Sequence, residues 1–145
     1  MAVRMPKLVV VDSSVIVKWL NRTDEPHSTQ AEALFDDWEA GKVRLIAPEL
    51  AKYEVGNAML NKRLDMPAFL ATLETFHAMP IVYVQQSAEA AEQTAEIAKT
   101  GGITFYDASF MQVAQQMGAV LITDNPKHQK SSQAVRVVAL ADYRH

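Results

Sequence analysis

Four acidic residues occupy positions where an isolated charge is costly in a soluble domain: Asp12, Glu54, Asp107 and Asp124. Asp12 and Asp124 directly follow apolar, strand-like runs, whereas Glu54 and Asp107 interrupt the apolar stripes of helix-like segments. An unpaired carboxylate on a core-facing surface is unfavourable unless a cation compensates its charge. Because hard divalent cations prefer oxygen ligands, this set of residues predicts a metal site.

The two strand-end acids also have structural interpretations. Asp12 could be the N-cap of the helix that follows it, although Ser13 or Ser14 could take that position as well. Asp124 precedes the turn signal Asn125-Pro126 and could simply form that turn.

The two helix acids have alternatives of the same kind. Glu54 lies on an apolar stripe, where it could be a partly exposed side chain paired with Lys62 or Arg63. Asp107 follows Thr104 at a spacing close to that of a capping box. No single acid decides between these interpretations, but the four together in one small domain favour a common site.

The expected elements alternate between strands and helices, which predicts an α/β fold with a parallel sheet of about five strands between helices. Strands are expected at residues 7–11, 43–47, 81–84, 120–123 and 135–140. Helices are expected at residues 13–20, 28–40, 48–63, 67–79, 88–101 and 104–117, with caps at Ser28, Ser87 and Thr104 and with Pro48 in a first turn. Sites in such folds form beyond the carboxyl ends of the strands, where Asp12 and Asp124 lie.

Composition bounds the class of protein. The 145 residues are enough for one domain, predicted as residues 1–145, and 49% of them are hydrophobic. The sequence has no cysteine, which excludes disulfides and thiolate metal sites. We find neither a run long enough to cross a membrane nor a signal-peptide pattern, so a cytoplasmic location is expected. The net charge of −3 does not by itself indicate a nucleic-acid binder, although a local basic rim could still hold phosphate.

Four segments, in order along nearly the whole chain, resemble the PIN-domain ribonucleases, and in particular the VapC-type toxins of toxin–antitoxin pairs. They are residues 9–20 (VVVDSSVIVKWL), 47–58 (APELAKYEVGNA), 102–114 (GITFYDASFMQVA) and 118–125 (GAVLITDN). The resemblance implies a PIN-like three-layer α/β/α fold and a homodimer. It also implies an RNA substrate and a cognate antitoxin whose tail covers the site.

The resemblance further implies the roles of individual residues. It identifies the four acids as the ligands of Mg²⁺ or Mn²⁺, with the hydroxyls of Ser13 and Thr123 in support. The sequence departs from the family pattern at one place. Many relatives have the fourth acid two residues after the strand-end threonine, but here Asp124 follows Thr123 directly and Asn125 takes the usual place. Asn125 is therefore an alternative ligand.

These features lead to the hypothesis of a metal-dependent endoribonuclease, in which the cation polarises the scissile phosphate and activates water for in-line attack. Candidate phosphate contacts are Lys18, Arg22, Lys52, Lys127, His128 and Lys130, each of which could also be an ordinary surface charge. The other three histidines, His27, His77 and His145, lack metal-ligand spacing and are interpreted as incidental.

Two other functions stay open. A catalytically weak or inactive PIN-like module could bind protein or RNA without cutting it, in keeping with the displaced fourth acid. A phosphatase of the haloacid-dehalogenase type also begins with an aspartate after its first strand, but it needs a second aspartate where this chain has Ser14. The apolar stripes around Phe35 and Phe69 could contact an antitoxin, although such stripes more often belong to the core.

Overall fold

The computed structural model describes residues 5–21, 26–132 and 134–145. Five parallel strands form one sheet in the order β3-β2-β1-β4-β5. The strands are β1 (Lys7–Val11), β2 (Val43–Pro48), β3 (Ile81–Val84), β4 (Val120–Thr123) and β5 (Val137–Ala139). The helices of the described residues are α1 (Ser13–Leu20), α2 (Ser28–Glu39), α3 (Leu50–Leu60), α4 (Met66–Ala78), α5 (Ala88–Gly101), α6 (Phe105–Met117) and the short 3₁₀ turn η1 (Leu140–Asp142). The expected α/β fold is confirmed.

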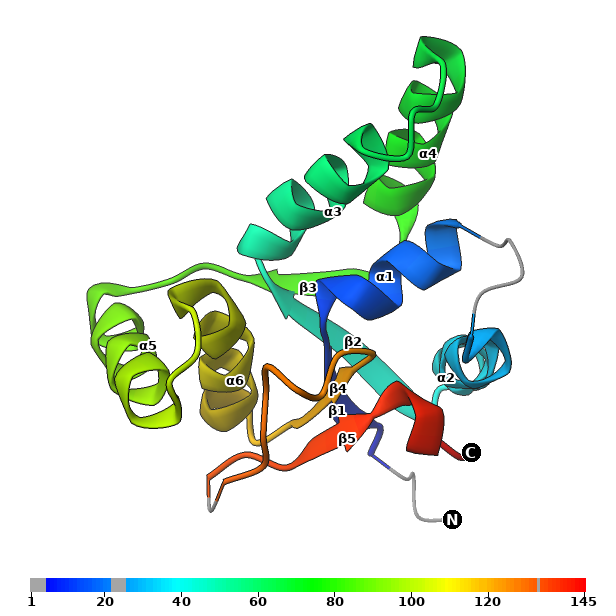
Figure 1. The fold of residues 1–145 in the computed structure, drawn as a ribbon. Coiled ribbons are helices and arrows are strands. Elements are labelled where there is room, and N and C mark those ends of the chain that lie inside the picture. The colour runs from blue at the N-terminus through cyan, green and yellow to red at the C-terminus, as the bar shows by residue number, and fades with distance from the viewer. Residues whose placement is uncertain (1–4, 22–25, 133) are drawn as a thin grey trace.

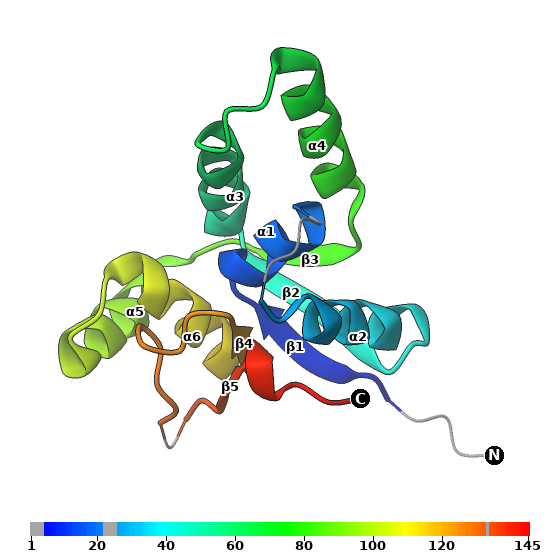
Figure 2. The ribbon, with the colours of Figure 1, turned by 45° about the vertical axis from the view of Figure 1, so that its right-hand side comes forward.

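Helices cover both faces of the sheet. α5 and α6 pack on one face, and α1 and α2 lie on the other (Figures 1 and 2). α3 and α4 form a pair that extends away from the sheet next to α1. This arrangement makes β1 and its neighbours the interior layer of the molecule. It brings the starts of α1 and α6 towards the carboxyl ends of the central strands.

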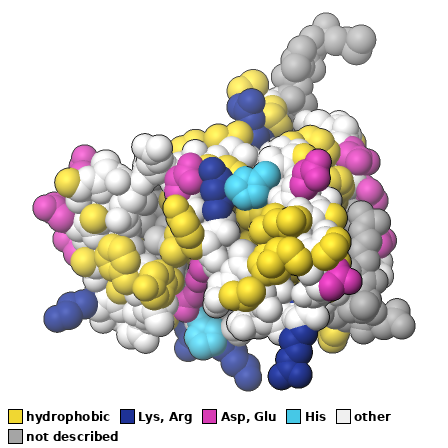
Figure 3. Space-filling model, turned by 90° about the horizontal axis from the view of Figure 1, so that it is seen from above, with side chains coloured by type: hydrophobic (Ala, Val, Ile, Leu, Met, Phe, Trp, Pro, Cys, Tyr) yellow, Lys and Arg dark blue, Asp and Glu magenta, His cyan; other side chains and the backbone are white. Residues whose placement is uncertain are grey.

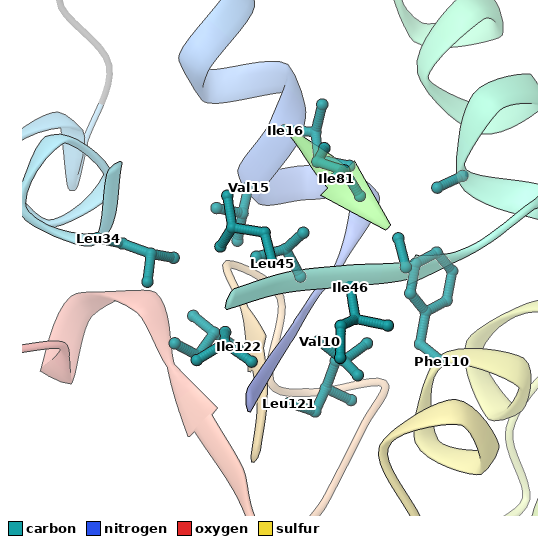
Figure 4. Close-up of a cluster of buried hydrophobic side chains, with 14 of the residues drawn as sticks. Val10, Val15, Ile16, Leu34, Leu45, Ile46, Ile81, Phe110, Leu121 and Ile122 are labelled. Atoms are coloured by element: carbon teal, nitrogen blue, oxygen red, sulfur yellow. The ribbon is translucent and has the colours of Figure 1, made fainter. Parts of the chain in front are cut away.

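The core lies on both sides of the sheet, which explains why the strands are continuous apolar runs. Leu45 and Ile46 of β2 point to opposite faces, and so do Leu121 and Ile122 of β4 (Figure 4). The face reached by Ile46 packs against Phe110 of α6, which is fully buried. Burying one such aliphatic or aromatic side chain stabilises the fold by roughly 1.5–3 kcal/mol.

Two of three helix starts differ from the sequence-based expectation, and the other decides between alternatives that the sequence left open. Asp12, not a serine, is the N-cap of α1, and its side chain accepts a hydrogen bond from the backbone N–H of Ser14. The N-cap of α2 is His27, which has a left-handed backbone with φ of 67° and forms no capping side-chain hydrogen bond, so the expectation of a Ser28 cap was wrong. Pro48 is the last residue of β2, because it pairs with Val84 of β3 and does not start the next helix.

The other element ends follow expectation more closely. Ser87 caps α5 and Thr104 caps α6 through their side-chain oxygens. β5 is shorter than expected, because the Val135 carbonyl closes a turn with the N–H of Ser132 before the strand begins. Within the described residues, no helix is long and apolar enough to cross a membrane.

Candidate metal centre

Three of the four predicted acids lie close enough together at the carboxyl edge of the sheet for their charges to interact. Asp12 follows β1, Glu54 lies in the middle of α3, and Asp107 lies in the first turn of α6. The negative charges of Asp12 and Asp107 both act on the Glu54 carboxyl, and Asp12 also acts on Asp107. We call these three residues the acid trio. Three elements that are far apart in the sequence therefore contribute carboxylates to a single site.

Asp12 is the most buried member of the acid trio, and hydrogen bonds fix its carboxylate at both oxygens. Its Oδ2 accepts from the backbone N–H of Ser14 at 3.1 Å and from the Ser14 hydroxyl at 2.5 Å. Its Oδ1 accepts from the side-chain amide of Gln129 at 3.3 Å. The backbone N–H of Asp12 donates to the Ile122 carbonyl of the neighbouring strand β4, which places Asp12 at the strand end.

Glu54 reaches the site from α3, and its Oε1 accepts a hydrogen bond from the Ser13 hydroxyl at 2.9 Å. The pKa of Glu54 lies above its ordinary value. Burial is the main cause of this rise; the hydrogen bond from Ser13 opposes it, and the charges of Asp12 and Asp107 add to it. Ser13 therefore holds one of the predicted ligands in place.

Asp107 is the third residue of α6, where its backbone N–H donates to the Thr104 hydroxyl at 3.0 Å. The pKa of Asp107 is also raised. Burial is again the main cause; a hydrogen bond with Thr104 opposes the rise, the charge of Asp12 adds to it, and His128 lowers the pKa slightly. The helix start thus presents a carboxylate whose negative charge is only partly compensated.

Asp124 has a different environment. Its Oδ2 lies 3.1 Å from Nζ of Lys18, and its Oδ1 lies 2.9 Å from Nδ1 of His27. Its backbone N–H donates to the Ser14 hydroxyl, so Asp124 borders the acid trio, but its carboxylate is engaged by these two partners. The next residue, Asn125, is exposed, and its N–H donates to the buried hydroxyl of Thr123. The roles of Asp124, Asn125 and Thr123 in metal binding stay predictions.

The predicted phosphate contacts fall into two groups. In the first group, the Lys18 side chain is only 7% exposed and pairs with Asp124, and Lys52 pairs with Glu49 at 3.1 Å while lying over the Tyr83 ring. Exposed basic side chains of the second group follow β4 in the segment leading to β5, and these are Lys127, His128 and Lys130. Arg22 lies outside the described residues.

Several residues at the site were not predicted. Gln129 is buried beside Asp12, Ser14 contacts both Asp12 and Asp124, and His27 contacts Asp124 and is therefore not incidental. The serine could have been suspected from the run that follows Asp12. The sequence holds no comparable signal for Gln129, which lies in a polar segment without periodicity.

The donor chemistry of the acid trio fits a hard divalent cation, because the trio presents oxygen ligands whose mutual repulsion a cation would relieve. In the part of the chain that the structure describes, no three His, Cys, Asp or Glu side chains are gathered closely enough to hold a metal ion by themselves. Mg²⁺ does not require such a cage, since it is usually bound by one or two carboxylates together with water and substrate phosphate. Asp12 and Asp107, with Glu54 adjacent, are the residues that would hold such an ion.

Comparison with known protein families agrees with this arrangement. The model of the PIN domain matches residues 9–132, which include all four predicted acids. The chain therefore belongs to the PIN-domain family. Comparison of the sequence with curated proteins finds no match.

Solved structures with the same fold include several from toxin–antitoxin systems. PAE2754 from Pyrobaculum aerophilum is 24% identical, with a TM-score of 0.65 over 91% of this chain and 90% of its own. VapBC2 from Rickettsia felis, solved with a DNA fragment of its promoter, is 14% identical with a TM-score of 0.70 over 91% and 98%. VapC20 from Mycobacterium tuberculosis, described as a toxin that cleaves the sarcin–ricin loop, is 18% identical with a TM-score of 0.60 over 78% and 86%.

Proposed function

We propose that this chain is a metal-dependent endoribonuclease that cleaves RNA phosphodiester bonds with Mg²⁺ or Mn²⁺. The observation that carries the proposal is the acid trio, in which the charges of Asp12 and Asp107 add to the rise that burial causes in the pKa of Glu54, and the charge of Asp12 adds to the rise in the pKa of Asp107. A purely structural carboxylate is normally paired or hydrogen-bonded so that its charge is compensated. Membership of the PIN-domain family supports the same function.

Some residues of the proposed site would hold the cation, and others would hold the substrate. Asp12 and Asp107 would bind the principal ion, and Glu54, steadied by Ser13, would bind it directly or orient a water molecule near it. The bound cation would supply electrostatic stabilisation of the phosphate and activation of the attacking water. The exposed basic segment after β4 would attract the RNA backbone, because Lys127 and Lys130 offer phosphate contacts there.

The decisive experiment measures cleavage of RNA by purified protein with Mg²⁺, with Mn²⁺ and with a chelator. We expect cleavage that requires the metal and is lost in the variants Asp12→Asn and Asp107→Asn. Glu49→Gln is a suitable control, because Glu49 lies near α3 but pairs with Lys52 instead of facing the acid trio. Undiminished cleavage by the Asp12 or Asp107 variant would reject the assigned roles.

We further propose that the protein acts in the cytoplasm as the toxin of a toxin–antitoxin pair and is inhibited by a cognate antitoxin. Its fold neighbours include VapC20, VapBC2 of Rickettsia felis and FitAcB of Neisseria gonorrhoeae. A cleft of about 1240 Å³ between α1, α2 and α4 offers a surface of mixed polar and apolar side chains for such a partner, and its apolar lining includes Trp19, Phe35 and Trp38. Co-purification with the product of the adjacent gene, and inhibition of cleavage by that product, would test this role.

A homodimer is the second partner that we propose. The end of the molecule formed by α3 and α4 carries hydrophobic side chains on its surface (Figure 3). The exposed large apolar residues of this end include Leu60, Leu64, Met66 and Leu70. Where such side chains form a contiguous exposed patch, the patch marks a candidate interface. Light scattering of the purified protein should give twice the mass of 16.1 kDa, and Leu70→Glu should shift it towards the monomer.

One observation favours a second candidate function, that of a PIN-like module that binds without cutting. The fourth acid, Asp124, is engaged by Lys18 and His27 and not by the acid trio. Calorimetric titration with Mn²⁺ separates the two functions, because an inert module has no need to bind the ion. Absence of binding would favour the module.

A further inference from the structure

Gln129 is a buried amide in a mostly exposed segment. Its side chain belongs to the connection between β4 and β5, where the flanking residues His128 and Lys130 are both exposed, yet Gln129 is only 2% exposed. Burying a side-chain amide is unfavourable unless hydrogen bonds compensate the loss of water. The contacts of the amide therefore explain why this residue is inside the protein.

Both contacts of the Gln129 amide nitrogen lead to the candidate metal centre. Its Nε2 donates to Oδ1 of Asp12 at 3.3 Å and to the backbone carbonyl of Asp107 at 3.2 Å. A side-chain amide has two N–H donors, so one nitrogen can serve both acceptors. It thereby links the end of β1 to the first turn of α6, the two elements that carry Asp12 and Asp107.

The hydrogen bonds to Asp12 also define where a cation can approach. An ionised carboxylate has about four acceptor sites, two on each oxygen. Ser14 occupies both sites of Oδ2 with its N–H and its hydroxyl, whereas Gln129 occupies one site of Oδ1. The remaining site of Asp12 is on Oδ1, the oxygen that Gln129 holds.

We propose that Gln129 is a positioning residue, which orients the Asp12 carboxylate and sets its separation from Asp107 so that the two can share one divalent cation. The inference rests on the proposed function, because it assumes that the acid trio binds a metal. Gln129 itself does not contact the ion. It acts through Asp12 and through the start of α6, as partners of metal ligands do when they fix ligand orientation.

The test is the variant Gln129→Met, which keeps the approximate length and volume of the side chain but removes both donors. The chain offers a matched control in Gln112, another buried amide, which is 3% exposed and lies on α6. Its Nε2 also donates two hydrogen bonds, to Gln93 at 3.0 Å and to Gln116 at 3.2 Å, and neither partner is an acid. Gln112→Met therefore removes the same kind of hydrogen bonds away from the site.

Affinity for Mn²⁺ is measured by calorimetry, together with thermal unfolding of the metal-free proteins. We expect both variants to be less stable than wild type, because each lacks two buried hydrogen bonds. We expect only Gln129→Met to bind Mn²⁺ more weakly, by about 10-fold or more. Gln129→Asn, whose amide is one methylene too short to reach both acceptors, provides a second variant if the methionine variant does not fold, and it too should bind Mn²⁺ more weakly than wild type.

Each other outcome has a distinct meaning. Wild-type affinity in the folded Gln129 variants would overturn the positioning role and leave the proposed function intact. Tighter binding by Gln129→Met would also overturn it, since the amide would then compete with the ion. An equal loss of affinity in Gln112→Met would overturn it as well, because the effect would be one of general stability. If the wild-type protein binds no Mn²⁺, the positioning role and the proposed metal dependence both fail.

Discussion

The buried carboxylate of Asp37 and the wholly or partly buried carboxylates of the acid trio lie in opposite electrostatic settings. Asp37 on α2 is only 3% exposed, and its oxygens are fully engaged: the hydroxyl of Tyr143 and Nδ1 of His145, at 2.7 Å, both contact it, and Nζ of Lys42 lies 4.0 Å away. The acid trio, by contrast, consists of carboxylates whose charges act on one another.

The pKa directions express this difference. Burial alone would raise the pKa of Asp37, but hydrogen bonds from Tyr143 and His145 and the nearby positive charges outweigh burial and lower it. The pKa values of Glu54 and Asp107 are raised, because burial and neighbouring negative charges outweigh their hydrogen bonds. Asp37 therefore stabilises the fold, whereas the acid trio costs stability that a bound cation would recover.

The largest expected effect is the loss of RNA cleavage when a residue of the acid trio is changed, because Asp37 is not expected to affect cleavage. Asp107→Asn should lower the rate of metal-dependent RNA cleavage by more than about 100-fold, because removing a direct ligand exceeds the effect of removing a partner of one. The folded state of the metal-free variant should be at least as stable as wild type, since one repulsive charge is gone. Cleavage kinetics and urea unfolding of the same preparation measure both quantities. A variant that unfolds but retains activity per folded molecule would reverse the assignment.

Asp37→Asn should lower stability without lowering the rate of cleavage. The free energy of unfolding is expected to fall by about 2–3 kcal/mol, because hydrogen bonds to a buried charged group are removed or weakened. Cleavage by the remaining folded protein should be unchanged. Asp36→Asn, one residue earlier and outside the described contacts of Tyr143 and His145, is the control in urea unfolding. Loss of activity without loss of stability would show that the two groups are not independent.

The sequence was sufficient to predict where the residues of the acid trio lie on their strand and helices, because those positions follow from local sequence patterns. A continuous apolar run followed by Asp12 places a carboxylate at a strand end, and helical periodicity places Glu54 and Asp107 on inward-facing stripes. Parallel strand order then brings these elements to one edge. The helix positions depend on a period of 3.6 residues and the strand end on a continuous apolar run, and a single sequence displays both.

The contacts that decide individual roles were not predictable in this way. Gln129 lies in a segment without periodicity, so nothing in the sequence indicates that its side chain turns inward. Asp37 was overlooked because its partner Tyr143 comes from the far end of the chain, more than a hundred residues away. The pairing of Asp124 with Lys18 requires the orientation of α1 over the end of β4, which follows from packing and not from spacing.

Asp124 can be assigned to one group or the other by a double-mutant cycle. Asp124→Asn should reduce the free energy of unfolding by about 1–2 kcal/mol, because it leaves the nearly buried Lys18 with a weaker partner. Adding Lys18→Met should recover part of that loss, since the positive charge that Asp124 pairs with is removed as well. Urea unfolding of the four proteins gives the coupling. If Asp124→Asn instead stabilises the metal-free protein and abolishes Mn²⁺ binding, Asp124 belongs with the acid trio.

The pH dependence of stability should have two limbs with opposite signs. The lowered pKa of Asp37 contributes stability that is present above its ordinary value of 3.8 and is lost as the pH falls through the folded-state pKa. The raised pKa values of Glu54 and Asp107 act oppositely. The native state binds more protons than the unfolded state above their ordinary values of 4.5 and 3.8, so metal-free stability falls as the pH rises through that range.

Urea unfolding of the metal-free protein at a series of pH values measures both limbs. Glu54→Gln should flatten the decline on the less acidic side, and Asp37→Asn should flatten the loss at the most acidic pH values. Saturating Mn²⁺ should reverse the decline on the less acidic side, because the ion binds the ionised carboxylates of Glu54 and Asp107. A decline that persists unchanged in both Glu54→Gln and Asp107→Asn would show that the acid trio is not its origin.

The smallest expected effect concerns the exposed basic segment beside the acid trio. The double variant Lys127→Ala, Lys130→Ala should weaken binding of RNA of any sequence and reduce the slope of log affinity against log salt by about 1 for each phosphate that is no longer neutralised. Binding is measured in Ca²⁺ with Asp107→Asn protein, so that the RNA stays intact. Lys7→Ala, Lys99→Ala is the control, because it removes the same charge from β1 and α5, outside the segment after β4. Equal slopes in the two double variants would indicate a general charge effect, whereas a change confined to the first would place the RNA backbone along the segment that also carries Gln129.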